Sequence, residues 1–136
     1  MTVAVETEGR GVLAIKVTGV ASTDNAGVGV VANPEGVPVV ILRTTIYFKT
    51  KSTGAANLGI GVTTVAAKAT DILNDLAVGG VTNGTVYNGH AMQNTAKTEI
   101  TAPALWAADK YITFTGSATT VGLEAYLFVE YVRAVA

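Results

Sequence analysis

The sequence contains no cysteine and few charged residues, and each shortage excludes a class of function. Without cysteine there are no disulfide bonds, no thiolate nucleophiles and no thiolate metal sites, which suits a chain folded in a reducing cytoplasm. Charged residues make up 14% of the chain, against about 25% in an average soluble domain. The 9 Lys and Arg are scattered among 10 Asp and Glu. No basic stripe is left to bind phosphates, so we expect no nucleic-acid partner.

Long apolar runs are also missing, although hydrophobic residues make up 49% of the chain. No window approaches the roughly 18 uninterrupted apolar residues of a membrane-spanning helix, so we expect no membrane partner. The apolar residues then belong to a core and to contacts between subunits. The N-terminal sequence MTVAVE lacks the basic and apolar segments of a secretory signal, and we expect the chain to be made in the cytoplasm.

Apolar and polar residues alternate along most of the chain, and many are β-branched, which predicts half-buried strands. Strands are predicted over residues 12–18, 39–49, 56–62, 97–101, 111–115 and 124–135. The one helix-like stretch, Thr70 to Leu76, predicts a short helix near residues 70–77. About eight strands joined by Gly, Asn and Pro turns predict an all-β, antiparallel β-sandwich of jelly-roll type, with a closed barrel as the alternative. The predicted sandwich domain covers residues 11–136.

Two of these strands have informative faces. Leu13, Ile15 and Val17 share one face of the first strand. In residues 39–49, strict alternation groups the side chains of one face as Val40, Leu42, Ile46 and Phe48, and those of the other as Ile41, Arg43, Thr45, Tyr47 and Lys49.

The last strand, in contrast, is apolar on both faces: Leu127, Val129 and Tyr131 lie on one, and Tyr126, Phe128 and Val132 on the other. Such a strand is either central in its sheet or covered by a partner on its outer face.

Glycines occupy one whole face of residues 56–62, where Asn57, Gly59 and Gly61 alternate with Leu58, Ile60 and Val62. A glycine face cannot pack side chains, so another backbone, a bulge or a neighbouring subunit must come close there. A bulge or a close approach within the chain is the favoured interpretation, and a subunit contact is the alternative.

Residues that could carry chemistry stand apart from one another. His90 is the only histidine, and no second metal ligand or carboxylate pair accompanies it. Residues 27–32 match a dinucleotide-binding pattern, but the sequence NPEG that follows cannot begin a helix. Asp71 and Asp75 would share one side of the short helix as solvated or capping residues. We therefore expect no enzyme activity, no metal and no cofactor.

Five residues are candidates for contacts with partners: Val3, Val5, Trp106, Tyr126 and Phe128. Val3 and Val5 alternate with polar residues in segment 1–10, which is either an arm that adds a strand to a neighbour or a frayed terminus. Trp106 either anchors a contact or plugs one end of the sandwich.

The chain resembles a group of phage and prophage proteins described as capsid decoration, cement or head-associated proteins. The resemblance covers about residues 40–132 and rests on ILRTTIYF (41–48), STGAANLGIGV (52–62), DILNDL (71–76), ADKYITFTG (108–116) and GLEAYLFVEY (122–131).

This resemblance implies a virion protein, assembled in the host cytoplasm, that binds the capsid exterior as a homo-oligomer. Its partners would be the major capsid protein and further copies of itself. Two alternatives remain open: a tail component or adhesin that binds carbohydrate through Trp106, Tyr87 and the Asn-rich loops, and a main shell subunit.

Overall fold

The computed structural model describes residues 10–89, 92–93 and 104–133. These residues form ten strands and no helix. The strands, in chain order, are β1 (Arg10–Thr18), β2 (Gly29–Ala32), β3 (Val39–Thr50), β4 (Asn57–Thr63), β5 (Leu73–Ala77), β6 (Thr85–Gly89), β7 (Met92–Gln93), β8 (Ala104–Trp106), β9 (Tyr111–Gly116) and β10 (Glu124–Arg133).

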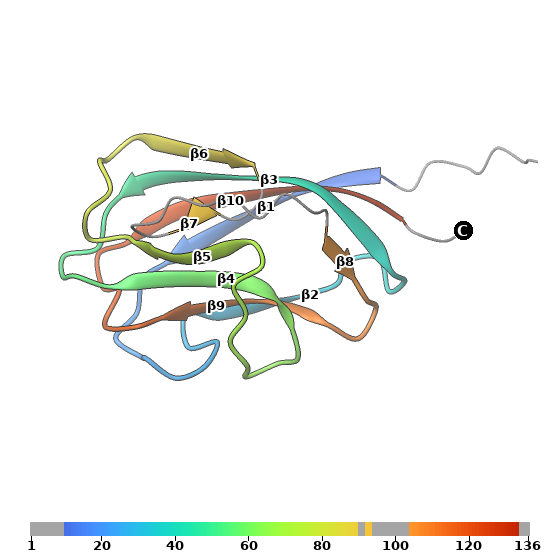
Figure 1. The fold of residues 1–136 in the computed structure, drawn as a ribbon, viewed down its shortest axis with the longest axis horizontal. Helices are drawn as coiled ribbons and strands as arrows, with labels where there is room; N and C mark the ends of the chain where they lie inside the picture. The colour runs from blue at the N-terminus through green and yellow to red at the C-terminus, as the bar shows by residue number, and fades with distance from the viewer. Residues whose placement is uncertain (1–9, 90–91, 94–103, 134–136) are drawn as a thin grey trace, which may run out of the picture.

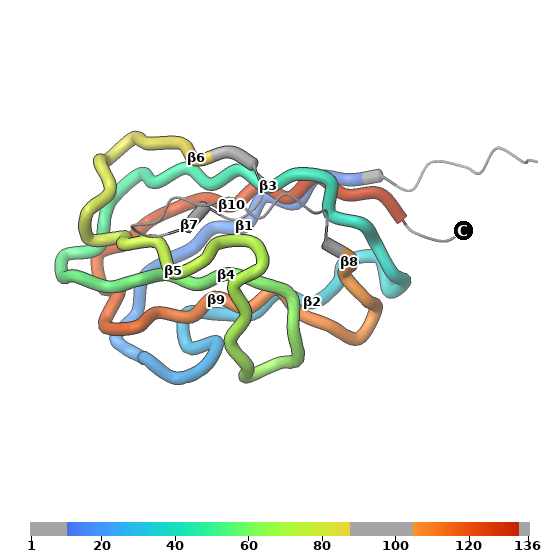
Figure 2. Tube along the Cα trace, in the orientation of Figure 1, coloured from blue at the N-terminus to red at the C-terminus, as the bar shows by residue number. Residues whose placement is uncertain are grey.

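Two sheets stacked face to face form the all-β sandwich that the alternation predicts (Figure 1). Sheet A has the order β1-β10-β3-β6, with β8 also paired to β3, and sheet B has the order β2-β9-β4-β5-β7. The pairs are antiparallel except β5 with β7. Figure 2 follows the chain as it passes repeatedly between the two layers.

The core lies between the sheets and consists of the inward side chains of both. Sheet A contributes Val17, Ile41, Ile46, Phe48, Leu127 and Val129, and sheet B contributes Leu58, Ile60, Leu73, Leu76, Ile112 and Phe114. The inward face predicted for β1 is confirmed. β10 lies between β1 and β3, which confirms the alternative that it is central, and its Leu127, Val129 and Tyr131 face the core. The outward side chains of β10 therefore lie in the middle of an exposed sheet face.

The faces predicted for the first part of β3 are wrong, because the strand contains a β-bulge. Arg43 pairs with Glu130 and Ile41 with Tyr131, which leaves Leu42 as an extra residue on β3. Ile41 consequently points into the core, whereas Leu42 and Arg43 are both exposed. The bulge thus adds an exposed leucine to the outer face of sheet A.

The short helix predicted near residues 70–77 is also wrong, since residues 73–77 form β5. Leu76 pairs with Leu58 and Leu73 with Ile60, so two residues of β5 face a single residue of β4 between these pairs. This bulge, with Asp75 at a φ of 53°, turns Leu73 and Leu76 to the same side. Ile72 and Leu76, which are four apart and both buried, therefore indicated a helix where the chain forms a bulged strand.

The glycine face of β4 is explained by a close approach within the chain. The segment between β4 and β5 crosses the outer face of sheet B, and a Cβ atom on Gly61 would lie 2.6 Å from the Cβ of Ala69. Asp71 fixes this segment, because its Oδ1 accepts a hydrogen bond of 2.8 Å from the backbone N–H of Val62. Lys68 forms an ion pair with Asp75 at 3.0 Å. Asp71 and Asp75 therefore hold the segment, and neither is the helix residue that was expected.

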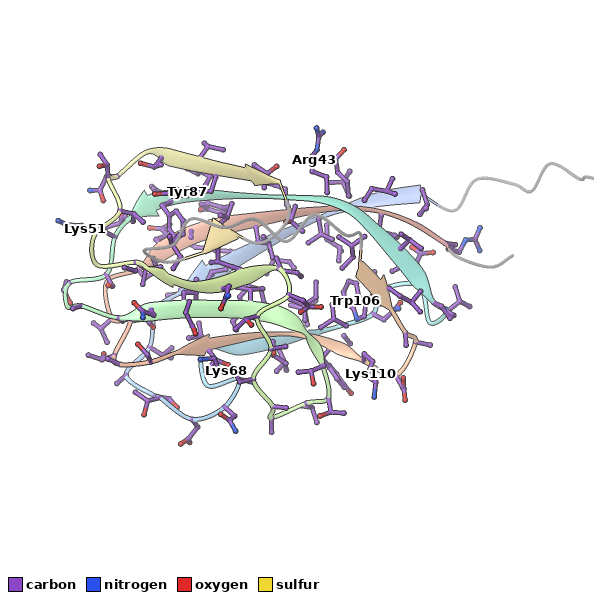
Figure 3. The ribbon with its side chains drawn as sticks, viewed as in Figure 1. Arg43, Lys51, Lys68, Tyr87, Trp106 and Lys110 are labelled. Carbon is purple, nitrogen blue, oxygen red and sulfur yellow. The ribbon has the colours of Figure 1, made fainter. Side chains whose placement is uncertain are left out.

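Trp106 closes one end of the sandwich (Figure 3). Its side chain is 0% exposed, and its indole Nε1–H donates a hydrogen bond of 2.8 Å to the carbonyl of Lys110. The amide nitrogen of Asn33 donates to the carbonyls of Val37 and Trp106, both at 3.0 Å. The turn after β2 is thereby tied to β8 around the tryptophan.

The same turn is joined to β10 by a part-buried side-chain hydrogen bond. Tyr131 donates a hydrogen bond of 2.7 Å to Oε2 of Glu35. This bond raises the pKa of Tyr131, and burial and the charge of Glu35 raise it further. Since the folded-state pKa lies above the unfolded value, the tyrosine's contribution to stability is complete below a pH of about 10 and is lost as the pH rises through the folded pKa.

Replacing Tyr131 with phenylalanine is expected to lower the free energy of unfolding by about 1 kcal/mol, because one hydrogen bond to an exposed carboxylate is lost. Urea denaturation at a pH of about 8 and again at about 11 measures both effects. The native protein should lose more stability between these two conditions than the Tyr131→Phe variant. Equal losses would show that Tyr131 does not titrate in this way.

Candidate interaction surface

The outer face of sheet A carries most of the exposed large apolar side chains of the described residues. Val12, Leu42, Val86, Leu105 and Phe128 are exposed there, on β1, β3, β6, β8 and β10. Val12 is 66% exposed, Leu105 61% and Phe128 36%. Exposed apolar residues that occur singly are ordinary, but a group spread over every strand of one sheet is typical of a surface that another molecule covers.

Aromatic residues occupy the middle of this face. Tyr126 and Tyr47 are cross-strand neighbours on β10 and β3, and their rings stack with centroids 6.3 Å apart. Phe128 follows two residues later on β10, between Ala14 of β1 and Thr45 of β3. Because both neighbours are short, the phenylalanine ring stands above them.

A groove lies at one end of the same face. It has a volume of about 310 Å³ and is lined by Gly11, Val12, Leu42, Glu130 and Tyr131. The β3 bulge supplies one wall, since it places Leu42 outward, and Val12 of β1 supplies the other. The groove runs over β10 and has room for an aliphatic side chain of a partner.

Charged residues on this face are paired with one another across strands. Arg43 Nε lies 2.6 Å from Glu130 Oε2, and Figure 3 shows Arg43 pointing away from sheet B. The hydrogen bond to Glu130, and then the charge of Glu130, raise the pKa of Arg43.

Glu124 lies 3.5 Å from both Lys16 and Lys49. Burial raises the pKa of Glu124, but the charges of Lys49 and Lys16 and their hydrogen bonds outweigh it and lower that pKa. Glu124 and Glu130 therefore each have basic partners on this face, so neither sign of charge dominates the surface.

Of the five candidate contact residues, the structure brings two together. Tyr126 and Phe128 lie side by side on the outer face of sheet A. Trp106 is buried, so the interpretation that it plugs one end of the sandwich replaces its use as a surface anchor. Val3 and Val5 lie outside the described residues.

The residues considered for other roles are placed as follows. Tyr87 is half-buried with its ring edge-on to Phe48, at 5.7 Å between centroids, so neither aromatic residue expected to stack on a sugar presents an open ring. His90 and the predicted strand over residues 97–101 lie outside the described residues. Within the described ranges, no three acidic or histidine side chains gather to hold a metal ion.

Four contributors to this surface were missed by sequence reasoning: Val12, Leu42, Val86 and Leu105. Val12 carried a signal, because it shares the outward parity of Ala14 and Lys16 on β1. Leu42 is outward only because of the bulge, and β6 and β8 were not among the predicted strands.

Comparison with protein-family models, with curated proteins and with solved structures finds no match to this chain. No helix in the described part of the chain has the length and apolar content to cross a membrane.

Proposed function

We propose that this chain is a non-enzymatic structural protein of a bacteriophage particle, which binds the outside of the capsid and bridges neighbouring capsomers. The observation that carries the proposal is the outer face of sheet A, where apolar side chains from five strands are exposed and the charges are paired among themselves. Such a face suits burial against protein, because few unpaired charges must be desolvated.

The order of the strands supports the same proposal by analogy. When the short strands β7 and β8 are set aside, the pairs β1 with β10, β2 with β9, β3 with β6 and β4 with β5 are nested within one another. We interpret this nesting as that of a jelly roll, a long antiparallel hairpin rolled into two sheets. Jelly rolls occur in viral capsid proteins, but also in lectins and cupins, so the fold alone does not assign the role.

The physics of decoration suits a small domain of this kind. Many copies of a modest interface add up through multivalency when they bridge a lattice. Binding only the mature lattice also stabilises that lattice by mass action. The protein then acts through its surfaces and requires no reaction.

Two matched valine substitutions test the proposal. Val86 on sheet A is 56% exposed, and Val65, in the segment that crosses sheet B, is 54% exposed. We expect Val86→Asp to reduce binding to expanded phage heads assembled without this chain by about tenfold or more, because a charge would be buried in the contact. Val65→Asp should bind as the native protein does.

The measurements are co-sedimentation with heads, resistance of the decorated heads to heat and chelation, and cryo-electron microscopy of particles with and without the chain. Failure of the native protein to bind heads or to appear on particles would overturn the proposal. Equal loss of binding in both variants would show that sheet A is not the contact surface.

A further inference from the structure

We propose that a second copy of this chain covers the β1 and β10 half of sheet A. The two copies are related by a two-fold axis that lies between their facing sheets, parallel to the strands and above the line between β1 and β10. The inference rests on the proposed function only in taking this face to be covered by protein. The occupant is a second copy of the chain, and the residues in contact lie on β1 and β10.

Three cross-strand pairs lie on the outer face of β1 and β10. They are Val12 with Glu130, Ala14 with Phe128 and Lys16 with Tyr126. Rotation about this axis places β1 of one copy over β10 of the other, at the same level along the strands. The β1 member of each pair therefore contacts the β10 member of the same pair in the second copy. Self-association requires that the two members of each pair fit one another.

The central pair satisfies this condition by shape. Phe128 protrudes and Ala14 beside it is short and exposed. The two-fold rotation places the Phe128 ring of each copy over Ala14 of the other, so each ring fills the space above a short side chain. Faces of sheets pack at about 10 Å with their strands nearly aligned, which this rotation allows.

The members of the other two pairs also fit one another across the two copies. The same rotation brings Val12 of a second copy over Glu130, which is the place of the groove between Val12 and Leu42. It also brings the ammonium group of Lys16 over the ring of Tyr126, the arrangement of a cation–π contact. An aliphatic side chain enters a groove whose walls are Val12 and Leu42, and a cation meets an aromatic ring.

Charge favours a second copy over a charged partner. Glu130 is neutralised by Arg43, and Glu124 keeps Lys49 as its partner when Lys16 turns to the second copy, so two identical faces do not repel one another. Val86 on β6 and Leu105 on β8 lie beyond the strands that the second copy covers. They remain available for the capsid.

Sedimentation equilibrium of the purified protein, without capsids, tests the inference. The native protein should be a dimer, and the single variants Ala14→Asp and Phe128→Lys should each raise the dimer dissociation constant by about 100-fold or more. An equimolar mixture of the two variants should recover dimers, because one contact then pairs the introduced carboxylate with the introduced ammonium group and the other remains native. Val65→Asp should stay dimeric, and circular dichroism should show all variants folded.

A native protein that is monomeric at every concentration up to hundreds of micromolar would overturn the inference, as would a mixture of variants that stays monomeric. Dissociation of Val65→Asp to the same extent would also overturn it. Head binding and its loss in Val86→Asp are read separately, so a failure of the dimer is distinguishable from a failure of the capsid role.

Discussion

Replacing Trp106 with alanine is expected to lower the free energy of unfolding by about 3–5 kcal/mol, the largest effect of any single substitution considered for this protein. The indole is fully buried at the end of the sandwich, so its removal leaves a cavity between the sheets. The carbonyl of Lys110 also loses its donor. Urea denaturation followed by far-ultraviolet circular dichroism measures the loss, since the variant has no tryptophan for fluorescence.

The preceding residue provides the control. Leu105 is 61% exposed on the same strand, so Leu105→Ala should change the free energy of unfolding by no more than about 0.5 kcal/mol. If Trp106→Ala fails to fold, Trp106→Phe, which keeps most of the buried ring, should fold and remain destabilised relative to the native protein. A Trp106→Ala variant as stable as Leu105→Ala would show that the indole does not close the core.

Regular alternation predicted the parts of the fold in which burial follows a period of two. In β1 and β10 the buried residues are every second one, because each strand has one face on the core and one outside. The sandwich could therefore be predicted from the sequence, and the central place of β10 was one of two alternatives that its two apolar faces left open. The candidate pair Tyr126 and Phe128 followed from that same parity.

Prediction failed where a bulge breaks the period. A bulge adds one residue, so every earlier position of the strand changes face, as Ile41 and Leu42 do on β3. The bulge at Asn74 and Asp75 of β5 breaks the alternation, so Ile72 and Leu76 are both buried at a spacing of four, which is also the spacing of a helix. Local sequence does not separate these two outcomes, because pairing with β4 decides between them.

The surface was harder to predict than the core, since its members come from strands far apart in the chain. Val86 and Leu105 join Phe128 on one face only because β6 and β8 both pair with β3. Their strands are short, and single exposed apolar residues carry no periodic signal. Trp106 illustrates the converse: a tryptophan in a predicted loop suits a contact or a plug, and the burial of Trp106 confirms the plug, which was the favoured interpretation.

Replacing Gly61 with alanine is expected to lower the free energy of unfolding by about 1–3 kcal/mol, because the segment that crosses sheet B leaves no room for a methyl group. The new Cβ would lie 2.7 Å from the backbone carbon of Ala69 and closer still to Asp71 Oδ1. The segment must move outward, and the hydrogen bond from the Val62 N–H to Asp71 weakens with it. Thermal and urea unfolding measure the change.

Gly29 in β2 is the matched glycine, since a Cβ there has no atom within 4 Å and its φ is not positive. Gly29→Ala should leave stability unchanged or raise it by up to about 1 kcal/mol, through the smaller conformational freedom of the unfolded chain. In an Asp71→Ala background, Gly61→Ala should cost less than in the native chain, because one clashing atom is gone. Equal effects of the two glycine substitutions, or an unchanged cost in that background, would mean that the segment does not pack on β4 as described.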